Sequence, residues 1–179
     1  PQDLSGMPPY KLNKANGLYV LTQDIIADGT AFILEASGIT LDLDGHHVVF
    51  GNNSSEQVFG VQITGGDNCK VTNGTIIQGN RSSDYSNAVR SFRATNPGVE
   101  VSGISTDVHL KNAQPMAFRH GGLKIHHNHI YSRVTELDSR HYPGNTLLRI
   151  DASGENVHIH DNLLTEACHL GIAVRSSNK

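Results

Sequence analysis

The feature that most constrains this chain is a short motif that recurs at intervals of 24 to 34 residues. Two copies, Ile125–Ile130 and Ile159–Leu164, share the order apolar residue, two residues, Asn, one residue, apolar residue. Similar motifs begin at Leu43 and Val71, which we align with each other, and a weaker one begins at Val101. Repeats with a period of roughly 20 to 50 residues are typical of solenoids, in which each repeat buries its apolar face against the next.

A second set of short segments alternates apolar and other residues. These segments are Phe32–Leu34, Val61–Ile63, Met116–Phe118, Leu148–Ile150 and Ile172–Val174. Alternation places every second side chain on one face of a strand, and Gly- and Asn-rich stretches between the segments predict turns. Residues 77–100 stay ambiguous, because an inward Phe92 would also turn Arg90 inward. The pattern predicts an all-β, single-domain solenoid of stacked parallel strands.

The composition excludes several classes of function. Lys and Arg number 14 and Asp and Glu number 17, so the net charge of −3 argues against a nucleic-acid binder. No apolar run reaches the ~18 residues that a membrane span needs. Two cysteines, Cys69 and Cys168, are too few for a disulfide scaffold or a metal finger, and we expect both to be buried apolar residues. The 11 histidines are the one unexpected count.

Several stretches resemble the repeats of right-handed parallel β-helix proteins. They are SGITLDLDGHHVVFGN, NCKVTNGTIIQGN, GLKIHHNHIYS and ENVHIHDNLLTEACHLGIAVRSSN. That group includes pectate, alginate and chondroitin lyases, mannuronan epimerases and polygalacturonases. The resemblance implies a right-handed parallel β-helix of about five to six coils over residues 17–179, with residues 1–16 as a lead-in or cap. We expect Asn128 and Asn162 to stack their amides in successive turns.

Alternation also predicts which polar side chains point outward. In the last two motifs, Lys124 is expected beside His158 and His126 beside His160. These four residues are the candidate bases or acids of a catalytic site, because the pKa of imidazole lies near neutrality.

The second outward set contains the candidate ligands for a substrate carboxylate, since an arginine binds a carboxylate with two parallel hydrogen bonds. Stacking predicts Arg119 beside Asp151 and Asp151 beside Arg175, with Arg149 nearby. His141 and Tyr142, from an inserted segment over residues 131–146, complete the set. A ladder of paired charges on the surface of a sheet would give the same pattern without any ligand.

We therefore expect a secreted, extracellular or periplasmic protein that acts on an acidic, uronate-containing polysaccharide. The favoured reaction is lyase chemistry by β-elimination, which needs cations to neutralise the uronate and a base to remove the adjacent proton. The alternatives are a non-catalytic β-helix, for glycan binding or as part of a larger surface protein, and a glycoside hydrolase. Further coils or another chain are expected to cover the C-terminal end of the stack.

Metal binding is a second interpretation of the histidines. His126, His158 and His160 could share a transition metal, because alternate residues of a strand face the same way. Calcium could bind the outward carboxylates Glu35, Asp42 and Asp44. Neither spacing matches an established metal motif, so the sequence assigns no metal ligands.

Overall fold

The chain folds entirely into short parallel strands and turns within the residues that the computed structural model describes. These residues are 4, 6–81, 85–92, 97–134, 146–152, 156–166 and 170–176. The strands are β1 (Tyr10–Leu12), β2 (Leu18–Val20), β3 (Ile25–Ile26), β4 (Phe32–Leu34), β5 (Thr40–Asp42), β6 (His47–Phe50), β7 (Phe59–Ile63), β8 (Lys70–Gln78), β9 (Asn87–Ser91), β10 (Glu100–Val108), β11 (Gln114–Phe118), β12 (Leu123–His126), β13 (His129–Ser132), β14 (Thr146–Ala152), β15 (Val157–His160), β16 (Leu163–Thr165) and β17 (Leu170–Ser176).

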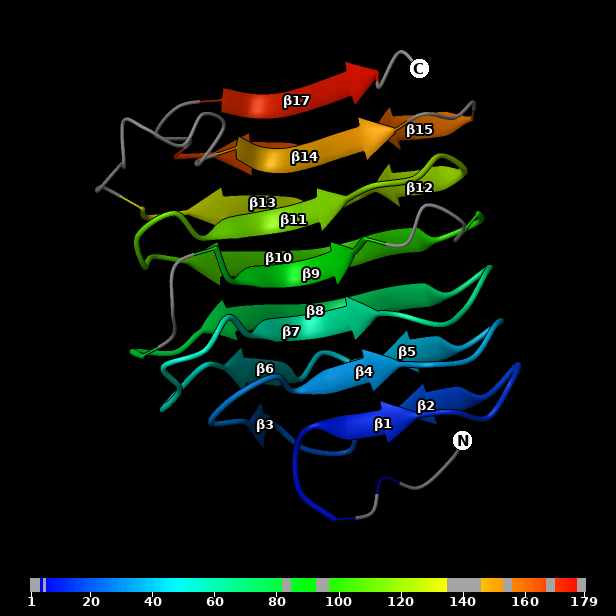
Figure 1. The fold of residues 1–179 in the computed structure, drawn as a ribbon, viewed down its shortest axis with the longest axis vertical. Coiled ribbons are helices and arrows are strands. Elements are labelled where there is room, and N and C mark those ends of the chain that lie inside the picture. Colours follow the sequence, from blue (N-terminus) through cyan, green and yellow to red (C-terminus); the bar gives the residue numbers. More distant parts are fainter. Residues whose placement is uncertain are drawn as a thin grey trace.

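The strands form two sheets between which the chain alternates (Figure 1). Sheet A has seven strands in the order β1-β4-β7-β9-β11-β14-β17. Sheet B has ten strands, with a main path β15-β12-β10-β8-β5-β2 and with β3, β6, β13 and β16 beside it. Each strand therefore pairs with its equivalent one repeat away, which is the arrangement of stacked coils and confirms the predicted parallel β-solenoid.

The register agrees with most of the repeat alignment and corrects it at one place. Val101 pairs with Ile125, which pairs with Ile159, as predicted. The partner of Val71 is Leu41, two residues before the predicted Leu43. Leu41 and Leu43 are both fully buried, so the apolar pattern alone fits either of them. A shift of two residues keeps the alternation, and the outward side chains of this coil stay outward.

The apolar core lies between the two sheets. It joins inward residues of sheet A, such as Phe32 and Phe118, with residues of sheet B, such as Phe50 and Val101, in one buried cluster. The coils touch closely at some turns: a Cβ atom on Gly65 would overlap the backbone carbonyl of Glu35 in the preceding coil. Cys69 is fully buried in this core, as predicted, whereas Cys168 lies outside the described residues.

An asparagine ladder joins the turns of the last two motifs. The Nδ2 of Asn128 donates to the Oδ1 of Asn162 at 2.9 Å and to the carbonyl of Val101 at 2.9 Å. The Oδ1 of Asn128 accepts the backbone N–H of Ile104 at 2.9 Å. Asn162 repeats the pattern, since its Nδ2 donates to the carbonyl of Ile125 at 2.8 Å. The predicted stacking of these amides is confirmed, and it fixes the two turns relative to each other.

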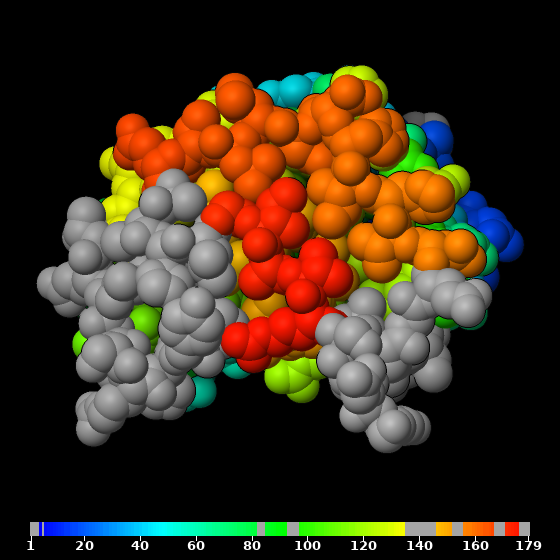
Figure 2. Space-filling model, turned by 90° about the horizontal axis from the view of Figure 1, so that it is seen from above, coloured from blue at the N-terminus to red at the C-terminus, as the bar shows by residue number. Residues whose placement is uncertain are grey.

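The C-terminal end of the stack exposes apolar side chains (Figure 2). There β17 lies beside the β15–β16 segment, and Leu163, Ile172 and Val174 are between 43% and 59% exposed. The part of the chain that the structure describes contains no helix long and apolar enough to cross a membrane.

Candidate functional site

Three arginines gather on the outer surface of sheet A. Val89, Met116 and Leu148 are paired neighbours that point into the core, so the next residue of each strand points outward. On β9 this residue is Arg90, and on β14 it is Arg149. Arg119 comes directly after β11 and adds a third guanidinium group, so cationic side chains from three successive strands share this surface.

Aromatic rings support two of these guanidinium groups. The Cζ of Arg90 lies 4.5 Å from the ring centre of Phe59 and 3.8 Å from that of Phe92. The Cζ of Arg119 lies 4.3 Å from the ring centre of Phe92. Such cation–π contacts hold a guanidinium plane in place while its edge stays available for hydrogen bonds. We call Arg90, Arg119, Arg149, Phe59, Phe92 and Asp151 the arginine face.

One carboxylate, Asp151, contacts these arginines among the described residues. Its Oδ2 accepts the Nε–H of Arg149 at 2.8 Å and lies 4.0 Å from the Nε of Arg119. Its Oδ1 is buried and has no hydrogen-bond partner. Arg175 is exposed and pairs in register with Asp151, as predicted. Three guanidinium groups with one carboxylate leave a net positive charge on this surface of an otherwise acidic protein.

The electrostatic environment of Arg90 is unusual. Partial burial, together with the positive charges of Arg119 and Arg149, lowers the pKa of this guanidinium to about 10. No acidic side chain among the described residues forms an ion pair with Arg90. A hollow of about 270 Å³ lies beside it, lined by Gln62, Ile63, Thr64, Arg90 and Phe92. This surface therefore combines a net positive charge with one arginine whose pKa is lowered.

The predicted histidines form a second cluster on sheet B. Lys124 pairs in register with His158, and His126 pairs with His160, as predicted. The rings of His126 and His160 stack with centres 5.0 Å apart and planes within 3°. Two turn residues adjoin them: the Nδ1 of His127 lies 2.9 Å from the Nδ1 of His126, and Asp161 contacts His160.

Acidic and basic side chains hold this cluster from the neighbouring coils. The Nζ of Lys70 forms an ion pair with the Oε1 of Glu100 at 2.8 Å and thereby lowers the pKa of the Glu100 carboxyl. The Oε1 of Glu100 lies 3.5 Å from the Nε2 of His126. A hydrogen bond from His160 lowers the pKa of Asp161 in the same way. An open hollow of about 450 Å³ adjoins the cluster, lined by Asp42, Thr72, Asn73, Ser102, Gly103, His126 and His127.

The two predicted clusters do not form one site. The arginines belong to sheet A and the histidines to sheet B, and these two sheets are separate layers of the solenoid (Figure 1). The core lies between the sheets, so the outward side chains of one sheet point away from those of the other. His141 and Tyr142 lie outside the described residues.

Sequence reasoning missed several members of both clusters. Arg90, Phe59 and Phe92 were not assigned to the arginine face, although the outward position of Arg90 follows once Val89 is taken as the inward residue. His127 and Asp161 lie in turns, where strand alternation makes no prediction.

The predicted calcium ligands do not gather into one site. Glu35 lies beside Lys11 at 3.8 Å, and Asp42 accepts the backbone N–H of Asp44 at 2.9 Å. Among the described residues, the group of three whose ligand atoms converge is His127, His160 and Asp161.

Comparisons with known proteins identify no relative of this chain. No protein-family model matches it, and neither a curated protein nor a solved structure shows significant similarity to it.

Proposed function

We propose that the arginine face binds the carboxylates of an acidic, uronate-containing polysaccharide, and that the protein is a polysaccharide lyase. The observation that supports this best is the convergence of Arg90, Arg119 and Arg149 on one surface, where Asp151, next to Arg119 and Arg149, is the one carboxylate among the described residues that contacts them. A guanidinium group binds a carboxylate through two parallel hydrogen bonds.

The proposed reaction is a β-elimination next to the uronate carboxylate. Arg119 and Arg149 would bind that carboxylate and neutralise its charge, which acidifies the proton on C5. Neutral Arg90 would accept this proton, and the C5–H electron pair would form the C4=C5 double bond. The C4–O4 bond then breaks and the leaving oxygen takes a proton from water. The base is placed on the arginine face because a general base must lie within hydrogen-bond reach of the proton it removes.

Two other functions remain as outcomes of the test. A non-catalytic glycan-binding protein would use the same arginines without elimination. A glycoside hydrolase needs two carboxyl groups about 5 to 9.5 Å apart. Among the described residues Asp151 alone contacts the arginines, and Arg149 holds it, which makes hydrolysis the weaker alternative.

The test is incubation with pectate, alginate and chondroitin while the ultraviolet absorbance of the unsaturated product is recorded. We expect R119A to lose at least about tenfold in kcat/KM, the magnitude of one charge-assisted hydrogen bond. R90A should lower kcat by about 10²- to 10⁴-fold with a smaller change in KM, as expected for a missing base. The control is R133A, because Arg133 is an exposed arginine that pairs with Asp107 on sheet B.

The outcomes separate the three functions. The lyase is supported if the wild type and R133A produce the ultraviolet absorbance of the unsaturated product and R90A does not. New reducing ends without absorbance indicate hydrolysis. Retention on an acidic-glycan column without either product indicates a binding protein, and unchanged retention of R119A would refute the arginine face itself.

We also infer the finer features of the fold and its setting. Parallel crossovers are right-handed in nearly all known cases, so we propose a right-handed helix of about five to six coils. The exposed Leu163, Ile172 and Val174 support further coils or another chain at this end of the stack. A polysaccharide substrate places the protein outside the cytoplasm, in a secreted, extracellular or periplasmic location.

A further inference from the structure

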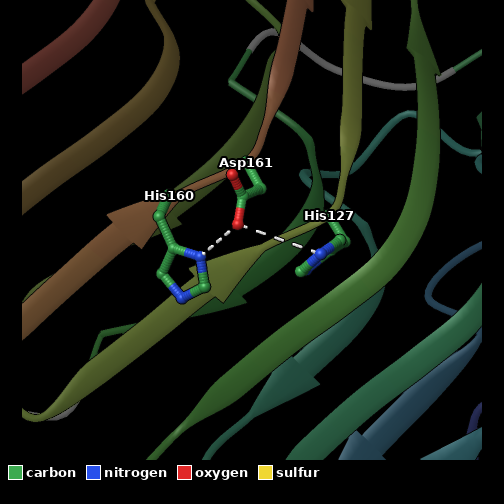
Figure 3. Close-up of side chains that lie close together, drawn as sticks. All are labelled: His127, His160 and Asp161. Carbon is green, nitrogen blue, oxygen red and sulfur yellow. Dashed lines mark hydrogen bonds and ion pairs between the residues drawn. The ribbon is translucent and has the colours of Figure 1, made fainter.

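Two stacked turns on sheet B bring together a set of metal-ligating side chains (Figure 3). His160 ends β15 and Asp161 follows it in the turn, while His127 occupies the equivalent turn one coil earlier. His127 and Asp161 both have left-handed backbone, with φ of 55° and 53°. The ladder of Asn128 and Asn162 follows directly after them and fixes one turn over the other.

The ligand atoms converge on the carboxylate of Asp161. Its Oδ2 lies 2.8 Å from the Nδ1 of His160 and 3.9 Å from the Nε2 of His127. One ligand atom from each of the three residues lies within 4.8 Å of the other two. Zinc bonds of ~2.0–2.1 Å in a tetrahedral site place the ligand atoms about 3.3 Å apart. The observed separations bracket this value, and the side chains are 64%, 53% and 65% exposed for His127, His160 and Asp161, so small rotations can close the site.

A chain of contacts favours one arrangement of protons on His127. The Nε2 of His126 faces the carboxylate of Glu100 at 3.5 Å, and this negative charge favours a proton on that nitrogen. In that tautomer the Nδ1 of His126 accepts a hydrogen bond from the Nδ1 of His127, 2.9 Å away. The Nε2 of His127 then keeps its lone pair on the side of Asp161. Metal-binding histidines are typically oriented by such a hydrogen bond on the second ring nitrogen.

We propose that His127, His160 and Asp161 bind one divalent first-row transition metal, with zinc as the ion to test. Two imidazole nitrogens and one carboxylate oxygen suit zinc, whereas calcium and magnesium prefer sites made of oxygen ligands. Three protein ligands leave at least one coordination position for water or an external group. This site is separate from the arginine face and does not depend on the function proposed for it.

A second histidine cluster in the same chain provides a matched control. His46 and His47 both face Asp24, so the residue types are the same. The Nδ1 of His46 lies 3.2 Å from Oδ1 of Asp24, whereas the Nδ1 of His47 lies 3.6 Å from Oδ2. The two imidazoles thus use different oxygens, and these three residues do not meet the convergence that His127, His160 and Asp161 show.

The test is calorimetric titration of the chelator-treated protein, without a histidine tag, with Zn²⁺. We expect one Zn²⁺ per chain in the wild type and in H46A, and at least about tenfold weaker binding in H127A, H160A and D161N. Titration with Co²⁺ should give visible absorption bands of a tetrahedral complex, which H127A removes. The far-ultraviolet circular dichroism of each variant confirms that it is folded.

Three results would overturn the proposal. The first is a wild-type protein that takes up no Zn²⁺. The second is a Zn²⁺ affinity that H127A, H160A and H46A all share with the wild type, and the third is an affinity that H46A alone reduces. Each of the last two places the bound ion elsewhere. H127A is the decisive variant, because this exposed turn side chain can be shortened without leaving a cavity in the core.

Discussion

Removal of the Asn128 amide should destabilise the solenoid by an amount that the structure allows us to calculate. In N128A three hydrogen bonds of the side chain disappear, to the backbone of Ile104, to the carbonyl of Val101 and to Asn162. Asn128 is only 2% exposed, so water cannot replace these partners in the folded state. At about 1 kcal/mol for each bond, N128A should lower the free energy of unfolding by about 3 kcal/mol.

Urea unfolding followed by circular dichroism measures this loss, and N162A provides a graded comparison. Asn162 belongs to the same ladder: it donates to the carbonyls of Ile125 and His160, and its Oδ1 accepts from the backbone N–H and the Nδ2 of Asn128. Asn162 itself is only half-buried. Water can satisfy part of what is lost there, so we expect about half the destabilisation of N128A. A loss below about 1 kcal/mol in N128A, or an equal loss in both variants, would refute the view that the buried amide ladder holds the coils together.

Three further predictions follow from other parts of the structure. Because the pKa of Arg90 is lowered to about 10, the fraction of neutral Arg90 rises about tenfold for each unit by which the pH increases toward 10. The elimination rate should therefore rise with pH and level off near pH 10, and a flat profile from pH 7 to 9 would exclude Arg90 as the base. G65A should cost about 3 kcal/mol or more in urea unfolding, because its Cβ would overlap the adjacent backbone, whereas G45A should cost only about 1 to 2 kcal/mol for its left-handed φ, since open space surrounds that position. Burial raises the pKa of Cys69, so in a C168S background this thiol should resist a disulfide reagent at pH 8 until urea unfolds the protein; rapid reaction of the folded protein would contradict its burial.

Strand alternation made much of this structure predictable. It depends only on a period of two residues, so it correctly placed Lys124 beside His158 and Asp151 beside Arg175 without any knowledge of the turns. The repeat alignment failed only at Leu43, where two buried leucines of the same parity compete for one position. The shape of the turn that follows decides between them: Asp44 and Gly45 both adopt positive φ there, and a leucine pattern carries no information about that.

The strand that contains Arg90 shows a different limit. Val89 and Phe92 have opposite parity, so only one of them can point inward, and apolar size alone favours the phenylalanine. The structure buries Val89 and turns Phe92 outward, where the guanidinium groups of Arg90 and Arg119 cover its ring. The two arginines that contact Phe92 on the outer surface belong to different coils. A search for apolar residues that point into the core therefore misses Phe92, because its ring packs against these arginines on the outer surface.

Turn residues are the least predictable part of both candidate sites, and the metal site consists mostly of them. Histidine and aspartate are enriched among the non-glycine residues that adopt left-handed backbone, but few residues of either type adopt it, so residue type alone does not predict it at His127 or Asp161. Their side chains meet because the asparagine that follows each of them bonds to the coil next to it, which sets the height and direction of both turns. Loss of the ladder should therefore weaken Zn²⁺ binding even though neither asparagine is a ligand. N162A, which should remain folded, is the variant for this test, and an unchanged Zn²⁺ affinity would show that His127 and Asp161 are aimed by something other than the ladder.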